Sequence, residues 1–290
     1  RDSFVGKNED PLSLNLYTYC HNNPVGFVDF NGHERIVVSG GIDGEEAFKY
    51  QFIETALKQI GSWKSQDFLQ GEFDKENDIT WIVANWNYND MDLRKYQISA
   101  LDKGINLMVI DDKEELFDYI NKDGRDEDLI ETMTFFAHGT AFDALGVSNP
   151  GYGYAVALGY GGSGKHNNAL NIFSSDLSKI KSSSFANSSS SVFYSCRTGN
   201  KFNNTIFAQE WANVTGSTTR AASGKGILSG RTDYTNIYEN PLPLMDTICS
   251  IFGKRSPRQK ARYTFGYSSS GSLNYPEVND GGKMKTFYPN

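Results

Sequence analysis

Two short segments of the sequence carry side chains that can together activate a thiol. His138 follows the apolar run 132–137 (TMTFFA), and Cys196 follows the run 191–195 (SVFYS). A thiol is mostly protonated at neutral pH, and a neighbouring imidazole either removes its proton or, as imidazolium, lowers its pKa. The resulting thiolate attacks carbonyl carbons, so we expect His138 and Cys196 to form a nucleophile–base pair.

A thiolate attack also requires donors for the oxyanion that develops on the carbonyl oxygen. Gly139 follows the histidine directly, and its lack of a side chain allows close approach of the backbone. We therefore predict that the N–H groups of Gly139 and Cys196 bind the oxyanion. Each residue also has a structural interpretation, because a buried cysteine commonly serves as a small apolar side chain.

The surrounding pattern alternates between apolar runs of strand length and segments of helical periodicity. This alternation predicts an α/β domain with a mostly parallel central sheet flanked by helices. Ligands of such sheets bind beyond the carboxyl ends of the strands, where His138 and Cys196 are both expected. The predicted strands are 35–38, 79–86, 105–110, 132–137, 191–195 and 217–222, with a hairpin at 154–160, and the predicted helices are 44–60, 91–103, 113–120, 170–180 and 203–212.

Two segments have compositions that predict irregular structure. The run 182–191 (SSSFANSSSS) is low in complexity and predicts an exposed, flexible loop, at which a maturing cleavage is expected. After Asn240-Pro241 the chain is rich in Gly, Ser and Pro, and 267–290 reads as a tail that wraps around the domain or extends from it.

Composition argues against several classes of function. The net charge of −7 is opposite in sign to that expected of a nucleic-acid-binding protein, so no nucleic-acid partner is predicted. An odd count of three cysteines argues against a disulfide scaffold, and no apolar run is long enough to span a membrane. The Gly-rich stretch around His166 lacks the spacing of a phosphate-binding loop, and Cys20 and His21 have no second ligand pair for zinc, so no cofactor or metal is predicted.

The two motifs FFAHGT (135–140) and VFYSCRTGN (192–200) resemble those of caspase-like cysteine peptidases, including the CHAT and clostripain-type branches. The resemblance continues through 207–212 and 219–222 and covers about residues 34–236. It implies a caspase-like fold with a Cys196–His138 dyad and an oxyanion donor at Gly139. Relatives that cut after Arg or Lys often have Asp two residues before the cysteine, where this chain has Tyr194, so the resemblance assigns no substrate specificity.

The first 33 residues resemble the end of an Rhs/YD-repeat core. The segment DPLSLNLYTYCHNNPVGFVDFNGH (10–33) follows the pattern DPLGLNLYxYxxNNPxxYxDPxGH, with Phe30 in place of a proline. In that family the core forms a shell and a variable toxin domain follows this junction. The resemblance implies an Rhs remnant at 1–33, a catalytic payload at 34–236 and an irregular extension at 237–290.

Together the two resemblances imply a secreted toxin fragment that is delivered into a target cell and cleaves a protein there as a cysteine endopeptidase. Its implied partners are the target-cell substrate, the Rhs core shell and a cognate immunity protein. Two alternatives stay open at this point. A Cys–His site also supports deamidation or acyl transfer, and a caspase-like fold can act as a non-enzymatic binding module.

Overall fold

The computed structural model describes residues 33–41, 49–70, 78–125, 128–141, 154–160, 166–202, 204–223 and 284–290. The Rhs-like segment 1–32 and most of the predicted extension 237–290 lie outside these ranges. No helix within them is long and apolar enough to cross a membrane.

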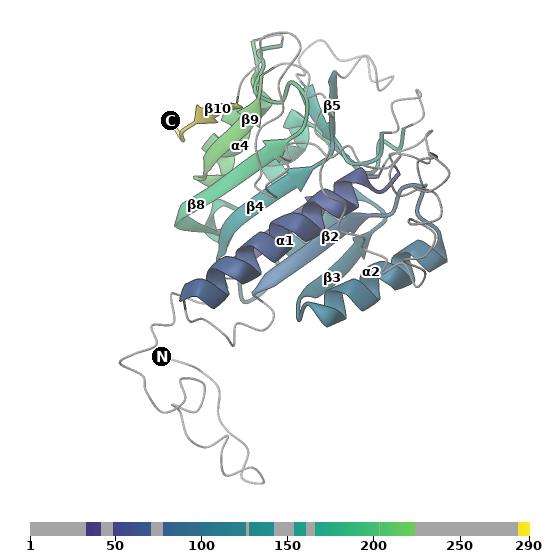
Figure 1. Ribbon diagram of the computed structural model, residues 1–290. Helices are drawn as coiled ribbons and strands as arrows, with labels where there is room; N and C mark the ends of the chain where they lie inside the picture. The colour runs from purple at the N-terminus through teal and green to yellow at the C-terminus, as the bar shows by residue number, and fades with distance from the viewer. Residues whose placement is uncertain are drawn as a thin grey trace, which may run out of the picture.

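The described strands form a seven-stranded sheet in the order β10-β9-β8-β4-β1-β2-β3 (Figure 1). All neighbouring pairs are parallel except β10 with β9. The predicted class, an α/β domain with a mostly parallel central sheet flanked by helices, is therefore confirmed. The strands are β1 (Glu34–Ser39), β2 (Ile79–Ala84), β3 (Asn106–Ile110), β4 (Ile130–Phe136), β8 (Phe185–Tyr194), β9 (Thr218–Ala222) and β10 (Met284–Phe287).

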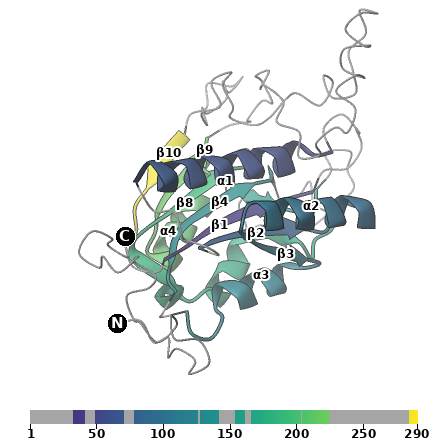
Figure 2. The ribbon, with the colours of Figure 1, turned by 60° about the horizontal axis from the view of Figure 1, so that its bottom comes forward.

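Helices cover both faces of this sheet because both faces are apolar (Figure 2). On one face, α1 (Gln51–Gln70) and α2 (Asp90–Asp102) pack through buried side chains such as Phe52 and Tyr96. On the other face, α3 (Lys113–Ile120) and α4 (Phe207–Thr215) contribute Phe117 and Trp211 to a second core cluster. Strand residues alternate between the two clusters, which is the two-sided burial expected of a parallel sheet.

A smaller antiparallel sheet lies beyond the end of β4. It has the order β5-β6-β7, formed by β5 (His138–Ala141), β6 (Tyr154–Ala157) and β7 (Asn171–Ile172). It is joined to the main sheet where the Gly41 N–H donates to the Leu158 carbonyl at 2.8 Å. The prediction of a hairpin strand at 154–160 is confirmed in part, since β6 ends at Ala157.

The prediction of a flexible loop at 182–191 is wrong. Residues 182–184 form a short 3-10 helix, η4 (Ser182–Ser184), and β8 begins at Phe185. Its serines fit a buried strand because neighbouring side chains satisfy their hydroxyls. The Ser189 and Ser217 hydroxyls are 2.7 Å apart, and the Trp211 indole N–H donates to the Ser191 hydroxyl at 2.9 Å. The expectation of a maturing cleavage in an exposed Ser loop loses its basis.

Several predicted boundaries also shift. The structure has α1 at Gln51–Gln70 rather than 44–60, and α4 at Phe207–Thr215 rather than 203–212. The predicted helix at 170–180 is β7 followed by a 3-10 helix, η3 (Ser174–Lys179), without a side-chain cap. The end of the chain is not irregular throughout, because Met284–Phe287 forms β10 at the edge of the main sheet.

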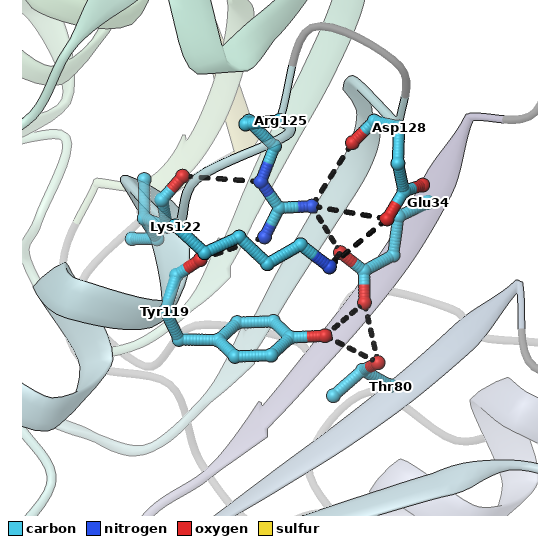
Figure 3. A network of polar contacts seen from close by, with 7 residues as sticks. Glu34, Thr80, Tyr119, Lys122, Arg125 and Asp128 are labelled. Atoms are coloured by element: carbon cyan, nitrogen blue, oxygen red, sulfur yellow. Dashed lines mark hydrogen bonds and ion pairs between the residues drawn. The ribbon is translucent and has the colours of Figure 1, made fainter.

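A buried ionic network holds the start of β1 (Figure 3). Glu34 is only 2% exposed, and its carboxylate pairs with the Arg125 guanidinium, which is 4% exposed. The same carboxylate accepts hydrogen bonds from the hydroxyls of Thr80 and Tyr119. Burial and the adjacent Glu34 charge raise the pKa of Tyr119, so its phenol remains a donor. The network therefore fixes the amino edge of the sheet, opposite the edge at which β4 and β8 end.

Candidate functional site

The strand register brings His138 and Cys196 to the same edge of the sheet. β4 and β8 are parallel neighbours, and their last registered pair is Phe136 with Tyr194. His138 and Cys196 each lie two residues beyond that pair, and neighbouring strands are about 4.8 Å apart. Both residues thus lie beyond the carboxyl ends of their strands, as predicted.

Gly139 lies directly against the backbone of Cys196. A Cβ atom at Gly139 would be 1.9 Å from the Cys196 carbonyl oxygen and 2.6 Å from its backbone nitrogen. No side chain can occupy that space without displacing the Cys196 backbone. The three residues singled out from the sequence, His138, Gly139 and Cys196, are therefore brought together in one place.

Aromatic rings enclose the His138 imidazole. The Phe52 ring from α1 packs edge-on with a centroid distance of 5.2 Å, and the Tyr160 ring does so at 5.6 Å. His138 retains partial exposure as a residue, but its Nε2 atom is buried without a hydrogen-bond partner among the described residues. Burial lowers the pKa of His138 to about 4, because an apolar environment disfavours the imidazolium. The imidazole is thus neutral at pH 7 and is a weaker base than a solvated histidine.

Cys196 lies in a turn that internal hydrogen bonds hold. It is half-buried against the core cluster beneath α1 and forms no disulfide with a described residue. The Thr198 hydroxyl donates to the Ser195 carbonyl at 2.9 Å, and the Asn200 N–H donates to the Arg197 carbonyl at 2.8 Å. Arg197 has a φ of 60°, in the left-handed region that costs a non-glycine residue about 1 kcal/mol or more. We call residues 195–200 the nucleophile turn, after the role that the sequence predicts for Cys196.

Gly199 connects the nucleophile turn to β9. Its N–H donates to the Ala222 carbonyl at 2.8 Å, and a Cβ there would lie 3.0 Å from the Ala221 and Ala222 carbonyl oxygens. The Ala208 N–H, in the first turn of α4, donates to the Thr198 carbonyl at 3.1 Å. Gly199 thus lies in the connection from β8 to α4, with its backbone against β9.

The packing of Phe52 and Tyr160 on the imidazole was not foreseen from the sequence. The sequence predicts Phe52 only as part of the helix at 44–60, and no local pattern indicates which ring of that helix reaches His138. Tyr160 was expected only as part of a hairpin. Both contacts are fixed by long-range packing.

The His138 imidazole and the half-buried Cys196 thiol come from neighbouring strand ends at one edge of the sheet. Nε2 of His138 makes no hydrogen bond to a described residue, the Cys196 thiol included. The described residues contain no group of three or more His, Cys, Asp or Glu side chains that could hold a metal ion. No described carboxylate bonds to Nε2 of His138, so the described residues supply no third member of a catalytic triad at that atom.

No protein-family model matches the sequence, and neither a curated protein nor a solved structure matches it.

Proposed function

We propose that this chain is a cysteine endopeptidase that acts through the Cys196–His138 pair. The observation that carries the proposal is the strand register, which places both residues two positions beyond the Phe136–Tyr194 pair. The contact of Gly139 with the Cys196 backbone supports it, since that contact requires a glycine at the position where an oxyanion donor is expected.

The lowered pKa of His138 favours a general-base mechanism over a preformed thiolate–imidazolium pair. The neutral imidazole accepts the thiol proton as the Cys196 sulfur attacks the peptide carbonyl carbon. The backbone N–H groups of Gly139 and Cys196 stabilise the oxyanion. The imidazolium then protonates the departing amine, which leaves a thioester on Cys196, and a water activated by His138 hydrolyses that thioester.

We also propose that the peptidase is the payload of an Rhs-type toxin that is secreted and delivered into a target cell. The proposal rests on the Rhs-like segment 1–33, which is followed directly by the first strand, β1, beginning at Glu34. A caspase-like fold for 34–236 belongs to the same proposal. The parallel order of β8, β4, β1 and β2 is compatible with it.

Cleavage is tested by comparing the wild-type chain with Cys196→Ala in a lysate of a sensitive cell. New amino termini are labelled and identified by mass spectrometry. The proposal predicts new termini with the wild type and none with Cys196→Ala. Equal sets of termini from both proteins would overturn it, and a small mass change in uncut targets would indicate deamidation instead.

Toxicity is tested by expressing the same two proteins, together with His138→Gln, inside that cell. The proposal predicts that the wild type stops growth and that both variants are tolerated at equal protein levels. Undiminished toxicity of Cys196→Ala would exclude Cys196 as the source of the effect.

A further inference from the structure

The last strand of the described residues, β10, pairs with a strand that lies far from it in sequence. β10 pairs antiparallel with β9 through four residues, from Met284 opposite Ala222 to Phe287 opposite Thr219. Residues 223–283 separate the two strands in sequence. β9 therefore has β8 on one side and a strand from the end of the chain on the other.

Side chains on both faces of the sheet anchor β10. Phe287 is 8% exposed and belongs to the core cluster beneath α4, whereas Met284 packs against the cluster beneath α1. Beyond the strand, the Gln209 side-chain amide donates to the Tyr288 carbonyl at 2.7 Å. The Asn290 N–H donates to the Asn213 side chain at 3.0 Å. The terminal residues are thus bound to β9 and to α4.

The same two elements support the nucleophile turn. β9 holds it through the carbonyls of Ala221 and Ala222 against Gly199, and α4 holds it through the Ala208 N–H. β9 is only five residues long, and a short edge strand that loses its partner exposes its backbone groups and loses order. A shift of β9 or α4 would be transmitted to Cys196 through contacts that leave no free space at Gly199.

We propose that the carboxyl-terminal strand, through Phe287, is a positioning element for Cys196, which rests on the proposed function of that residue as a nucleophile. Phe287 contacts no reacting group. It fixes β9 and α4, which fix the nucleophile turn. A chain that lacks residues 284–290 then has the catalytic side chains but not their geometry.

The test measures thiol reactivity rather than peptide cleavage. The full chain, Phe287→Ala and a chain that ends at residue 283 are treated with iodoacetamide well below their unfolding temperatures, and labelling of Cys196 is followed by peptide mass spectrometry. We expect the Cys196 rate constant to fall at least about tenfold in Phe287→Ala and in the chain that ends at residue 283. A misplacement of a reacting group by about 1 Å can lower a rate by about a hundredfold. Lys285→Ala is the matched control, since Lys285 is exposed on the same strand, and it should leave the rate unchanged.

Rescue separates positioning from general loss of stability. A synthetic peptide of the last seven residues, MKTFYPN, is added to the chain that ends at 283, and a peptide of scrambled sequence serves as the control. We expect the native peptide, and not the scrambled one, to restore Cys196 labelling in the shortened chain in a saturable manner. In the full chain, we expect Phe287→Leu to label at Cys196 faster than Phe287→Ala. If the shortened chain fails to fold, the Phe287 variants carry the test alone.

The contrary result is a lower unfolding temperature for Phe287→Ala with an unchanged Cys196 rate constant, which would make β10 a purely structural strand. That outcome differs from failure of the proposed function. If Cys196 of the wild-type chain labels no faster than Cys20 and Cys249 of the same chain, the nucleophile assignment itself fails.

Discussion

Gly139 and Cys196 are in backbone contact, with the position of a Gly139 Cβ only 1.9 Å from the Cys196 carbonyl oxygen. The contact joins the two segments that carry the candidate catalytic residues, one from the end of β4 and one from the end of β8. It makes the geometry of the site depend on the absence of a single methyl group.

Gly139→Ala should therefore impair both the fold and the site. We expect a loss of about 1–3 kcal/mol in the free energy of unfolding, as for other overpacked positions, and a much slower reaction of Cys196 with iodoacetamide. Chemical denaturation and peptide mapping measure the two effects. Gly61→Ala is the control: Gly61 lies within α1 with nothing within 4 Å of its Cβ position, so alanine should stabilise the protein by about 0.5–1 kcal/mol. A Gly139→Ala protein with wild-type reactivity would contradict the described contact.

The buried imidazole of His138 should make stability depend on pH. Its pKa of about 4 in the folded protein lies below the ordinary value of 6.5, so between these values the unfolded chain binds the proton more tightly. The contribution of His138 to stability is therefore present above about pH 6.5 and is lost as the pH falls towards 4. The free energy of unfolding of the wild type minus that of His138→Gln should fall by about 1–3 kcal/mol across this window. A difference that does not change with pH would show that the imidazole is not buried in its neutral form.

Ser191 in β8 and Ser195 directly after that strand should respond in opposite ways to removal of their hydroxyls. The Ser195 Oγ is buried without a hydrogen-bond partner among the described residues, so Ser195→Ala should be neutral or slightly stabilising. The Ser191 Oγ accepts from the Trp211 indole, so Ser191→Ala leaves a buried donor unpaired and should cost about 1–3 kcal/mol. Thermal unfolding of the two variants in parallel checks the contrast, and equal losses would argue against these hydroxyl environments.

The Glu34 network should affect stability without affecting the site. Glu34→Ala removes the buried carboxylate that pairs with Arg125 and leaves only that of Asp128, which is 3.5 Å away and 37% exposed, so it should cost about 3–5 kcal/mol. Because Glu34 begins β1, at the end of that strand opposite the edge with His138 and Cys196, the Cys196 rate constant of the folded fraction should be unchanged. Labelling at a temperature where the variant is folded measures this directly. A large fall in the rate would mean that the two edges are coupled.

The sequence predicted where β4 and β8 end better than it predicted how long β8 is. His138 and Cys196 follow apolar runs that end at a clear change of composition, so the positions of both strand ends could be read locally. The length of β8 could not, because Ser189 and Ser191 are buried only where Ser217 and Trp211 supply partners from elsewhere in the chain. Composition alone therefore led to the wrong prediction of an exposed loop at 182–191, most of which belongs to β8.

Long-range pairing explains the other differences. β10 forms by pairing with β9, which lies about 60 residues earlier in the sequence, and no local pattern identifies β9 as its partner. The contact of Phe52 with His138 likewise depends on how α1 packs across the sheet, which periodicity does not specify. The candidate residues of the site could be predicted from residue types. The contacts that hold them in place, from β9, β10 and α1, could not.

The central claim is that Cys196 is a nucleophile activated by His138. Its most direct test is the rate of Cys196 alkylation as a function of pH in the wild type and in His138→Gln, with Cys20 and Cys249 of the same chain as internal references. The account predicts that wild-type Cys196 reacts fastest of the three near neutral pH and that His138→Gln removes this advantage. Equal rates for Cys196 in the two proteins at every pH would contradict it.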